Sequence, residues 1–392
     1  MKIDDKTSHN SPSLRFPEFT GEWENTTLEE CVDFLDGQRK PIKSDDRKGE
    51  KRLYPYYGAS GIIDYIDEYI FDGDYILLSE DGANIIDRNY RVAFIANGKI
   101  WVNNHAHVLQ PHKEMNINFL SETLERINYA IYNTGTTMPK LNQEICRKIN
   151  LNVPSLSEQN KIGNLLYLLN ERIATQNRLI DRLQSLMIGL NNSLYEQYGN
   201  DITTSFMELG YSYSGLSGKS AKDFGSGKPF ITYLNVYSNI IVDETDYQYV
   251  RINDGEKQNI VRTGDVLFTL SSETPEEVGI GSVYLGEKEV YLNSFCFGIH
   301  IERNQLAYSP YLSYYVTSTA FRKFIYPFAQ GSTRFNLCKA DFEKASIKLP
   351  SLDNQKRISA MLDCIAEKIQ AEKAILEYYN IQRQYLLRQM FI

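Results

Sequence analysis

The stretch LNVPSLSEQNKIGNLL, residues 151–166, returns as IKLPSLDNQKRISAML at residues 347–362. The same spacing relates Gly135-Thr136-Thr137 to Gly331-Ser332-Thr333. A phrase repeated at a fixed distance indicates a duplicated unit, and 392 residues are enough for two or three folding units. We therefore expect two similar halves in one chain.

Each copy of the repeat opens a long helix. It begins at Pro154 or Pro350, followed by a serine that suits a helix N-cap, and a long stretch without proline comes next. Apolar residues then recur in alternating steps of four and three, which predicts the heptad seam of a coiled coil. The seam reads Ile162, Leu166, Leu169, Ile173, Gln176, Ile180, Leu183, Met187, Leu190 and Leu194 in the first copy, and Ile358, Leu362, Ile365, Ile369, Glu372, Leu376, Tyr379, Leu386 and Met390 in the second.

Each seam carries a polar residue at the same place, Gln176 or Glu372. A helix of roughly 40 residues spans about 60 Å, which is longer than a small domain is wide, so we interpret the helices as spacers. If they pair antiparallel, the two polar residues lie in neighbouring layers and fix the register. The alternative is two long helices buried in one ordinary bundle.

The roughly 150 residues before each helix contain short alternating runs typical of strands, such as DYILLS and RVAFIA in the first half and DVLFTL and GSVYLG in the second. Short helices are expected near residues 118–133 and 309–326. The predicted fold class is α+β, with two similar mixed α/β domains in tandem, each followed by a long helix, and the two helices paired as an antiparallel coiled coil. The expected boundaries are 1–153 and 200–349 for the domains, and 154–199 and 350–392 for the helices.

Composition indicates a globular protein, since 42% of residues are hydrophobic and 23% are charged. The start MKIDDKTSHN lacks the apolar stretch of a secretory signal, and no run of about 18 apolar residues follows, so we expect a cytoplasmic protein. Five scattered cysteines without a CxxC pair indicate reduced thiols, and argue against a disulfide framework or a zinc finger.

The net charge of −8 opposes nucleic-acid binding by the chain as a whole, because phosphate contacts need Lys and Arg. Net charge does not describe a local patch, however. A basic face, or cationic partner subunits, would be needed for a DNA-binding role.

Several phrases resemble those of one family. They are LRFPEF at Leu14, YPYYGASGIIDYIDEYIFDGDYILLSEDGA at Tyr54, WVNNHAHVL at Trp101, GTTMPKLNQE at Gly135 and both PSLxxQ helix starts. Together they resemble the specificity subunits of type I restriction-modification systems, from Leu14 to the C-terminus. One departure is Glu80, where related sequences often carry a basic or small residue.

The resemblance implies a non-catalytic DNA-binding subunit with one target recognition domain in each half, each reading half of a bipartite site in double-stranded DNA. The helices would set the spacing and dock two modification (methyltransferase) subunits, with restriction subunits in the full complex. The resemblance also implies that the partners use S-adenosylmethionine, ATP and magnesium, and that this chain holds no cofactor.

No catalytic set emerges from the residues themselves. The triplet Gly218-Lys219-Ser220 lacks the first glycine of a phosphate-binding loop, because that position is Tyr213. Neither a dinucleotide-binding glycine pattern nor the Asn/Asp-Pro-Pro-aromatic motif of amino-methyltransferases occurs. A solitary methyltransferase or nuclease, and a coiled-coil adaptor without DNA contact, remain the alternative functions.

Candidate DNA contacts are cationic, hydroxyl, amide or aromatic side chains in the two globular parts. Their alternatives are solvated charges and capping hydroxyls in turns. His105 and His107 flank Ala106, and we interpret them as a structural pair and not as metal ligands. The candidates are Arg39, Lys40, Lys43, Tyr57, Asn84, Thr136, Thr137, Lys140, Lys219, Lys222, Asn235, Ser332, Thr333 and Arg334.

Overall fold

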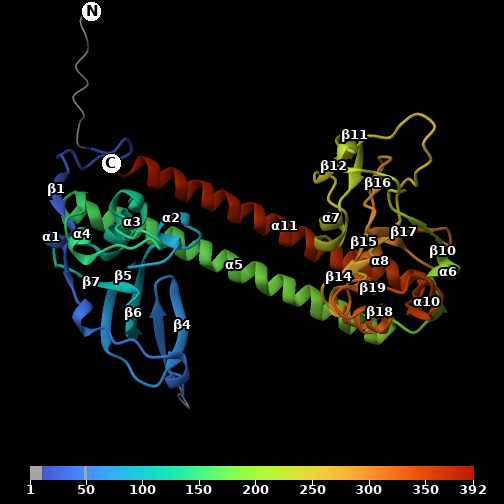
Figure 1. Ribbon diagram of the computed structural model, residues 1–392, viewed down its shortest axis with the longest axis horizontal. Coiled ribbons are helices and arrows are strands. Elements are labelled where there is room, and N and C mark those ends of the chain that lie inside the picture. Colours follow the sequence, from blue (N-terminus) through green and yellow to red (C-terminus); the bar gives the residue numbers. More distant parts are fainter. Residues whose placement is uncertain (1–10, 48–50) are drawn as a thin grey trace, which may run out of the picture. The chain divides into compact units, whose positions relative to one another are not determined.

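The computed structural model describes residues 11–47 and 51–392 (Figure 1). The first ten residues, on which the expectation of no secretory signal partly rests, lie outside the described residues. The chain divides into two compact units: unit 1 comprises Met1–Asn177 and Ala374–Ile392, and unit 2 comprises Arg178–Lys373. Within the described ranges, we find no helix that is both long enough and apolar enough to span a membrane.

Unit 1 is built on a six-stranded sheet in the order β2-β7-β5-β6-β3-β4. Neighbouring strands are antiparallel except β3 and β6, which are parallel. A separate strand pair, β1 and β8, joins the start of the unit to the segment before the first long helix. The strands are β1 (Glu24–Thr27), β2 (Val32–Phe34), β3 (Tyr54–Gly58), β4 (Gly61–Ile66), β5 (Phe71–Ser79), β6 (Ala93–Val102), β7 (Ala106–Pro111) and β8 (Asn150–Val153).

The central strand β5 of this sheet is buried on both faces. Ile76 and Leu78 belong to the cluster that contains Leu120 and Leu124, whereas Leu77 belongs to a second cluster on the opposite face. Burial on both faces explains the continuous apolar run in DYILLS, because a half-exposed strand would alternate. The helices of the unit are α1 (Leu28–Cys31), α2 (Asn84–Asp87), α3 (Ile117–Arg126) and α4 (Gln143–Arg147).

Unit 2 divides its strands among smaller sheets, in the orders β10-β17-β13-β15, β12-β11-β16, β14-β19-β18 and β20-β9. The strands are β9 (Ile202–Thr204), β10 (Gly210–Ser214), β11 (Phe224–Ile231), β12 (Tyr247–Val250), β13 (Val266–Thr269), β14 (Ser271–Ser272), β15 (Gly281–Val283), β16 (Tyr291–Leu292), β17 (Cys296–Ile301), β18 (Ala329–Gln330), β19 (Phe335–Leu337) and β20 (Ile347–Leu349). The helices are α6 (Phe206–Leu209), α7 (Tyr233–Ser238), α8 (Ser309–Tyr315), α9 (Thr319–Ile325) and α10 (Lys339–Lys344).

The core of unit 2 is aromatic. Phe268 stacks on Phe297 with ring centroids 5.4 Å apart, and Phe342 meets Phe268 edge-on at 5.2 Å. Phe206 and Phe321 complete this group of buried rings. Aromatic pairs in such geometries add to the energy of area burial, so this cluster is the main packing centre of the unit.

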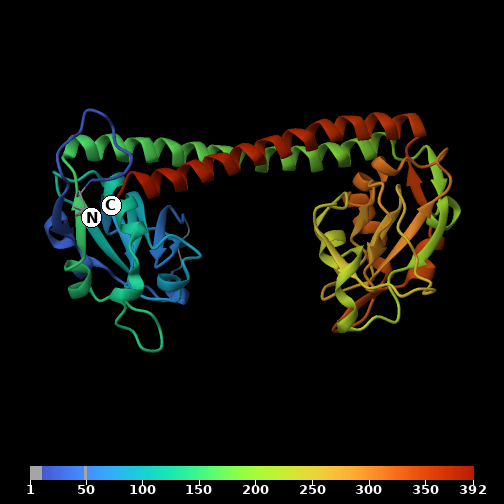
Figure 2. The same cartoon turned by 90° about the horizontal axis from the view of Figure 1, so that it is seen from above.

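The two long helices are α5 (Leu156–Tyr198) and α11 (Leu352–Gln389), and each is divided between the units. In unit 1, Ile162 shares a cluster with Met390 and Phe391, and Asn170 accepts a hydrogen bond from Arg383 at 2.6 Å. These contacts require antiparallel segments, and the end of α11 runs beside the start of α5 in both views (Figures 1 and 2).

Burial follows the predicted seam. Its buried members include Ile162, Leu166, Leu169, Ile180, Ile358, Leu362 and Ile369. Glu372 is 5% exposed and forms an ion pair with Lys368. Both expected long helices are present and these seam positions are buried, whereas the complete heptad seam and the proximity of Gln176 and Glu372 stay predictions.

The glutamine of each PSLxxQ phrase joins the start of its long helix to the globular part of the same unit by hydrogen bonds to the backbone. Gln159 donates to the carbonyls of Pro154 and Glu114, at 2.9 and 3.3 Å, and accepts from the Asn116 amide. Gln355 donates to the carbonyls of Pro350 and Leu306, at 2.9 and 2.8 Å, and accepts from the Tyr308 amide. The repeated phrase therefore both begins the helix and attaches it to the preceding domain.

Candidate nucleic-acid interface

Both units hold three loop segments together with the same backbone contacts. In unit 1 the Glu80 amide donates to the His105 carbonyl at 2.9 Å, and the Leu141 amide donates to the Glu80 carbonyl at 2.7 Å. In unit 2 the amide of Leu270 donates to the Phe295 carbonyl and that of Leu337 to the Leu270 carbonyl, both at 2.8 Å. We call each arrangement the loop frame.

Two further contacts complete the loop frame in each unit. A β-bridge joins Asp81 to Lys140 in unit 1, and the corresponding pairing joins Ser271 to Asn336 in unit 2. An asparagine fixes the turn before the next strand: the side chain of Asn103 accepts from the His105 amide, and that of Asn293 accepts from the Phe295 amide. The duplicated backbone therefore presents equivalent positions in both units.

The loop at residues 134–140 of unit 1 is pinched at its base. The Asn133 side chain accepts hydrogen bonds from the amides of Gly135 and Lys140, both at 2.9 Å. A Cβ atom on Gly135 would lie 1.8 Å from the Met138 carbonyl oxygen, so only glycine fits. This closure leaves the tip, including Thr136 and Thr137, exposed.

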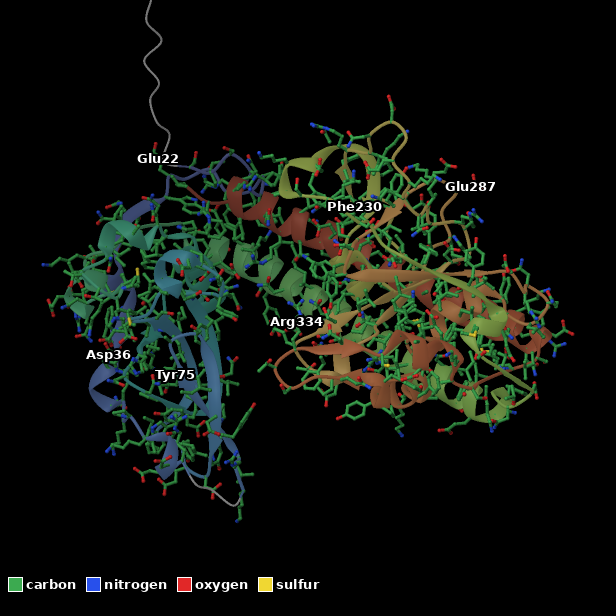
Figure 3. All side chains as sticks on the ribbon, turned by 45° about the vertical axis from the view of Figure 1, so that its right-hand side comes forward. Glu22, Asp36, Tyr75, Phe230, Glu287 and Arg334 are labelled. Carbon is green, nitrogen blue, oxygen red and sulfur yellow. The ribbon has the colours of Figure 1, made fainter. Side chains whose placement is uncertain are left out.

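The corresponding loop of unit 2 joins β18 to β19. Gly331 has φ +146, and a Cβ atom there would lie 2.1 Å from the Arg334 carbonyl oxygen. Ser332, Thr333 and Arg334 are exposed at the tip, and Arg334 can be located in Figure 3. The loop frame thus brings together the predicted candidates Thr136, Thr137 and Lys140 in one unit, and Ser332, Thr333 and Arg334 in the other.

The other predicted cations and the tyrosine lie outside the frame loops. Lys40, Lys43 and Lys222 are exposed. Tyr57 is half-buried, its ring centroid lies 6.1 Å from that of Phe94, and burial raises the pKa of its phenol.

Three predicted contacts are instead engaged within the fold. Asn235 is fully buried, and its amide donates to the carbonyls of Asp243 and Asp246 while accepting from the Asp243 amide. The Lys219 side chain is 6% exposed and donates to Glu256 and the Arg251 carbonyl, both at 2.6 Å. For these two residues, we replace the predicted contact role with a structural one. Asn84 spans its own loop by bonding both backbone groups of Tyr90.

The fourth engaged candidate, Arg39, belongs to a partly buried polar network that we call the polar lock. Its members are Asp36, Arg39, Glu80 and His107, of which His107 is fully buried. Arg39 donates to Glu80 at 2.6 Å and lies 3.5 Å from an Asp36 oxygen. His107 Nδ1 meets Asp36 at 2.6 Å, and its Nε2 meets the Leu141 carbonyl at 2.9 Å. Because Glu80 and Leu141 are frame residues, the lock supports the loop frame from inside; its Asp36 is labelled in Figure 3.

The electrostatics of the lock favour its charged form. Burial of His107 opposes the imidazolium, but hydrogen bonds with Asp36 and Cys146 outweigh it and raise the pKa of His107 to about 10. Burial likewise opposes the Asp36 carboxylate, yet the hydrogen bond with His107 outweighs it and lowers the pKa of Asp36. The two shifts agree on an ion pair held at neutral pH.

One atom each of Asp36, Glu80 and His107 lie within 4.8 Å of one another, as metal ligands would. The Arg39 guanidinium already supplies the positive charge there, and both nitrogens of His107 have partners. His105 binds a different carboxylate, that of Asp81, at 2.8 Å. This donor set fits a salt-bridged lock better than a metal site.

Sequence reasoning passed over Asp81, Phe295 and Asn336 as frame residues. The paired phrase WVNN and YLNS, residues 101–104 and 291–294, points to Phe295 because its asparagine fixes the turn that follows. Asp81 and Asn336 are identified only by the strand pairing.

Comparisons with known proteins identify the family and the fold of the chain. Residues 20–185 and 216–378 each match the family described as type I restriction modification DNA specificity domain. A putative type I restriction enzyme specificity subunit of Haemophilus influenzae is 26% identical over 364 residues, covering 87% of this chain and 86% of the relative. A putative type I specificity subunit of Mycoplasma pneumoniae is 25% identical over 378 residues, covering 89% and 94%.

Among solved structures, the type I restriction-modification S subunit from M. genitalium matches with a TM-score of 0.62 and 15% identity, covering 97% of this chain and 99% of that one. A chain from a study of complex assembly and conformational transition in the type I system matches with a TM-score of 0.54 and 17% identity, covering 94% and 97%. These likenesses confirm the α+β fold with two tandem domains and two long helices. The two family matches fall one in each half of the sequence, and the chain therefore belongs to the type I restriction-modification DNA specificity family.

Proposed function

We propose that this chain reads a bipartite site in double-stranded DNA, with each unit contacting one half-site through its loop frame. The observation that carries the proposal is the loop frame itself: it occurs once in each unit, with identical backbone contacts, in a chain whose two halves each match a DNA specificity domain. A duplicated scaffold with different exposed loops suits the reading of two unlike sequences.

The chain performs no chemistry in this proposal. Two modification subunits dock on the long helices and methylate adenine with S-adenosylmethionine, and restriction subunits that use ATP and magnesium complete the complex, all in the cytoplasm. The cationic partners also supply part of the phosphate contact that a chain of net charge −8 lacks. Exposed cations such as Lys40, Lys43 and Lys222 supply the rest locally.

The helices set the distance between half-sites. Removing one heptad from both α5 and α11 shortens a helical spacer by about 10 Å, which corresponds to about three base pairs of DNA. We expect a shorter gap between unchanged half-sites. An unchanged gap in an assembled complex would refute the spacer role and leave the DNA-reading role intact.

The deciding experiment is co-expression of the chain with its cognate modification subunit, followed by mapping of methylated adenines across a genome at single-base resolution. The expected result is one motif of two short blocks separated by a fixed gap. A single continuous motif, or no motif despite an intact complex, would contradict the proposal. Binding of S-adenosylmethionine by the purified chain alone would instead favour an enzyme.

A further inference from the structure

The loop frame has the same backbone in both units but different side chains at four equivalent positions. The bridge position is Asp81 in unit 1 and Ser271 in unit 2, and its partner is Lys140 or Asn336. The turn position is His105 or Phe295. The loop-tip position, set by the repeat spacing, is Met138 or Arg334. The pairs are thus acidic against hydroxyl, cationic against amide, imidazole against phenyl, and thioether against guanidinium.

Packing does not account for the residues at the turn and tip positions. Phe295 is 57% exposed and Met138 is 61% exposed. The imidazole of His105 is half exposed and faces Asp81 at 2.8 Å. A large apolar side chain that stays in water contributes little to folding, and its burial against a bound ligand would be favourable.

The surroundings in unit 2 suit a flat polar ligand. The Arg334 guanidinium carbon lies 5.9 Å from the centre of the Phe295 ring. Beside this pair is a hollow of about 320 Å³, whose lining includes Tyr233, Glu273, Phe295 and Arg334. Arg donates bidentately to the O6 and N7 atoms of guanine, and Asn pairs similarly with adenine, so Arg334 and Asn336 offer purine-reading chemistry.

The surroundings in unit 1 differ in kind. The Asp81 carboxylate accepts hydrogen bonds, which suits the exocyclic amino group of cytosine, and an apolar tip such as Met138 suits the methyl group of thymine. Lys140 lies 3.4 Å from Glu80 and keeps half of its side chain exposed. Met138 therefore offers thymine-reading chemistry at the position where unit 2 carries the guanine-reading Arg334. Asp81 adds an acceptor for cytosine at the position where unit 2 carries a serine.

We propose that the accessible variable frame positions, Asp81, His105, Met138 and Lys140 in unit 1 and Phe295, Arg334 and Asn336 in unit 2, determine the base preferences of the two half-sites, whereas Ser271, which is 5% exposed, supports the frame. The inference rests on the proposed function and adds to it the residues that discriminate between bases. The rest of the loop frame positions these side chains.

The test uses the full chain co-expressed with its modification subunit, with methylated adenines mapped genome-wide. Unit 1 receives the unit 2 residues in the double substitution Asp81→Ser and His105→Phe. We expect at least one base of one half-site to change or relax by about tenfold or more in relative methylation, with the other half-site unchanged. In unit 2, the truncation Arg334→Ala is expected to relax a guanine position in the other half-site only.

A matched control lies at the far end of the same strand. His112 follows β7 just as His105 precedes it, and its Nε2 atom lies 3.4 Å from Asp33, so it is also a partly exposed His–Asp pair. The double substitution Asp33→Ser and His112→Phe makes the same chemical change away from the loop frame. It is expected to leave both half-sites unchanged.

The outcomes separate this inference from the proposed function. A wild-type complex that marks no bipartite motif overturns the proposed function and this inference with it. A bipartite wild-type motif that no frame substitution alters overturns the inference alone, as does an equal shift in the His112 control. If the double variant fails to assemble with the modification subunit, Met138→Arg decides, because that exposed tip residue is not needed for packing.

Discussion

The two units pair equivalent strands directly behind the loop frame, but the buried side chains at these strands are ionic in unit 1 and aromatic in unit 2. In unit 1, β5 pairs with β7 so that Leu78 faces His107; in unit 2, β13 pairs with β17 so that Phe268 faces Phe297. His107 is 1% exposed and belongs to the polar lock, whereas Phe297 is 1% exposed and stacks in the aromatic core. One backbone therefore supports either an ion-paired interior or an aromatic one.

This difference shows what each interior demands. A buried ion network loses solvation, and it is tolerated only while every member keeps its partner. An aromatic cluster has no polar partner to lose, but it depends on filled volume. Unit 1 should therefore be sensitive to the removal of one charge and to pH, and unit 2 to the loss of ring volume.

The largest expected effect is the truncation of Phe297 in the aromatic core. Phe297→Ala should cost about 3–5 kcal/mol of unfolding free energy in unit 2, because burial is lost and a cavity remains. Hydrogen exchange resolved by segment would place the loss in residues 178–373 and spare unit 1. The control is Phe295→Ala, two residues away and 57% exposed, which should change stability by less than about 0.5 kcal/mol. Equal losses would mean that the aromatic core is not the packing centre.

A smaller loss is expected from the removal of one charge from the polar lock. Arg39→Met leaves Asp36 and Glu80 as neighbouring carboxylates and should destabilise unit 1 by about 2–4 kcal/mol. Segment-resolved exchange would show the loss around β5, β7 and the loop at 134–140. Lys40→Met removes the adjacent exposed cation and should be nearly neutral. An Arg39 variant that keeps full stability but loses DNA binding would restore Arg39 as a DNA contact.

The third prediction concerns pH. Because the pKa of His107 is raised from 6.5 to about 10, its contribution is complete below pH 6.5 and is lost as pH rises toward 10. The pKa of Asp36 is lowered from 3.8, so its contribution is complete above that value and is lost as pH falls further. Unit 1 should therefore lose stability on the order of 2 kcal/mol between pH 7 and pH 9, relative to a His107→Gln variant. A constant difference between the two proteins would show that His107 is already neutral at pH 7.

The architecture could be predicted from the sequence because its main features leave periodic or repeated patterns of residues. The heptad spacing predicted both long helices, and the repeat predicted two similar domains; the helices are present and each half matches the family. Short helices expected at 118–133 and 309–326 correspond to α3, and to α8 with α9. Such features depend on neighbours in sequence, which is why one chain suffices to find them.

The candidate site was harder to predict from the sequence, because its contacts join residues that are far apart along the chain. Asp36 and His107 are 71 residues apart, and Arg39 and Glu80 are 41 apart, so no local pattern indicates that either pair meets. Asn235 looked suited to base reading by residue type, yet tertiary burial uses all of its polar atoms. Residue type indicates what a side chain is able to bind, and only the fold decides whether it is free to do so.

The smallest expected effect separates two neighbouring lysines of unit 2. Lys222 is exposed, whereas Lys219 is bonded to Glu256. If Lys222 contacts a DNA phosphate in the assembled complex, Lys222→Ala should weaken binding by less than about tenfold for every sequence and reduce the salt slope by about one. Lys219→Ala should instead loosen the loop that holds Arg251 and leave the salt slope unchanged. Salt titrations of binding, made beside segment-resolved exchange, would distinguish the two roles. An equal slope change for both lysines would mean that the ion pair with Glu256 opens on DNA, and that burial in the free chain does not decide which cations reach phosphate.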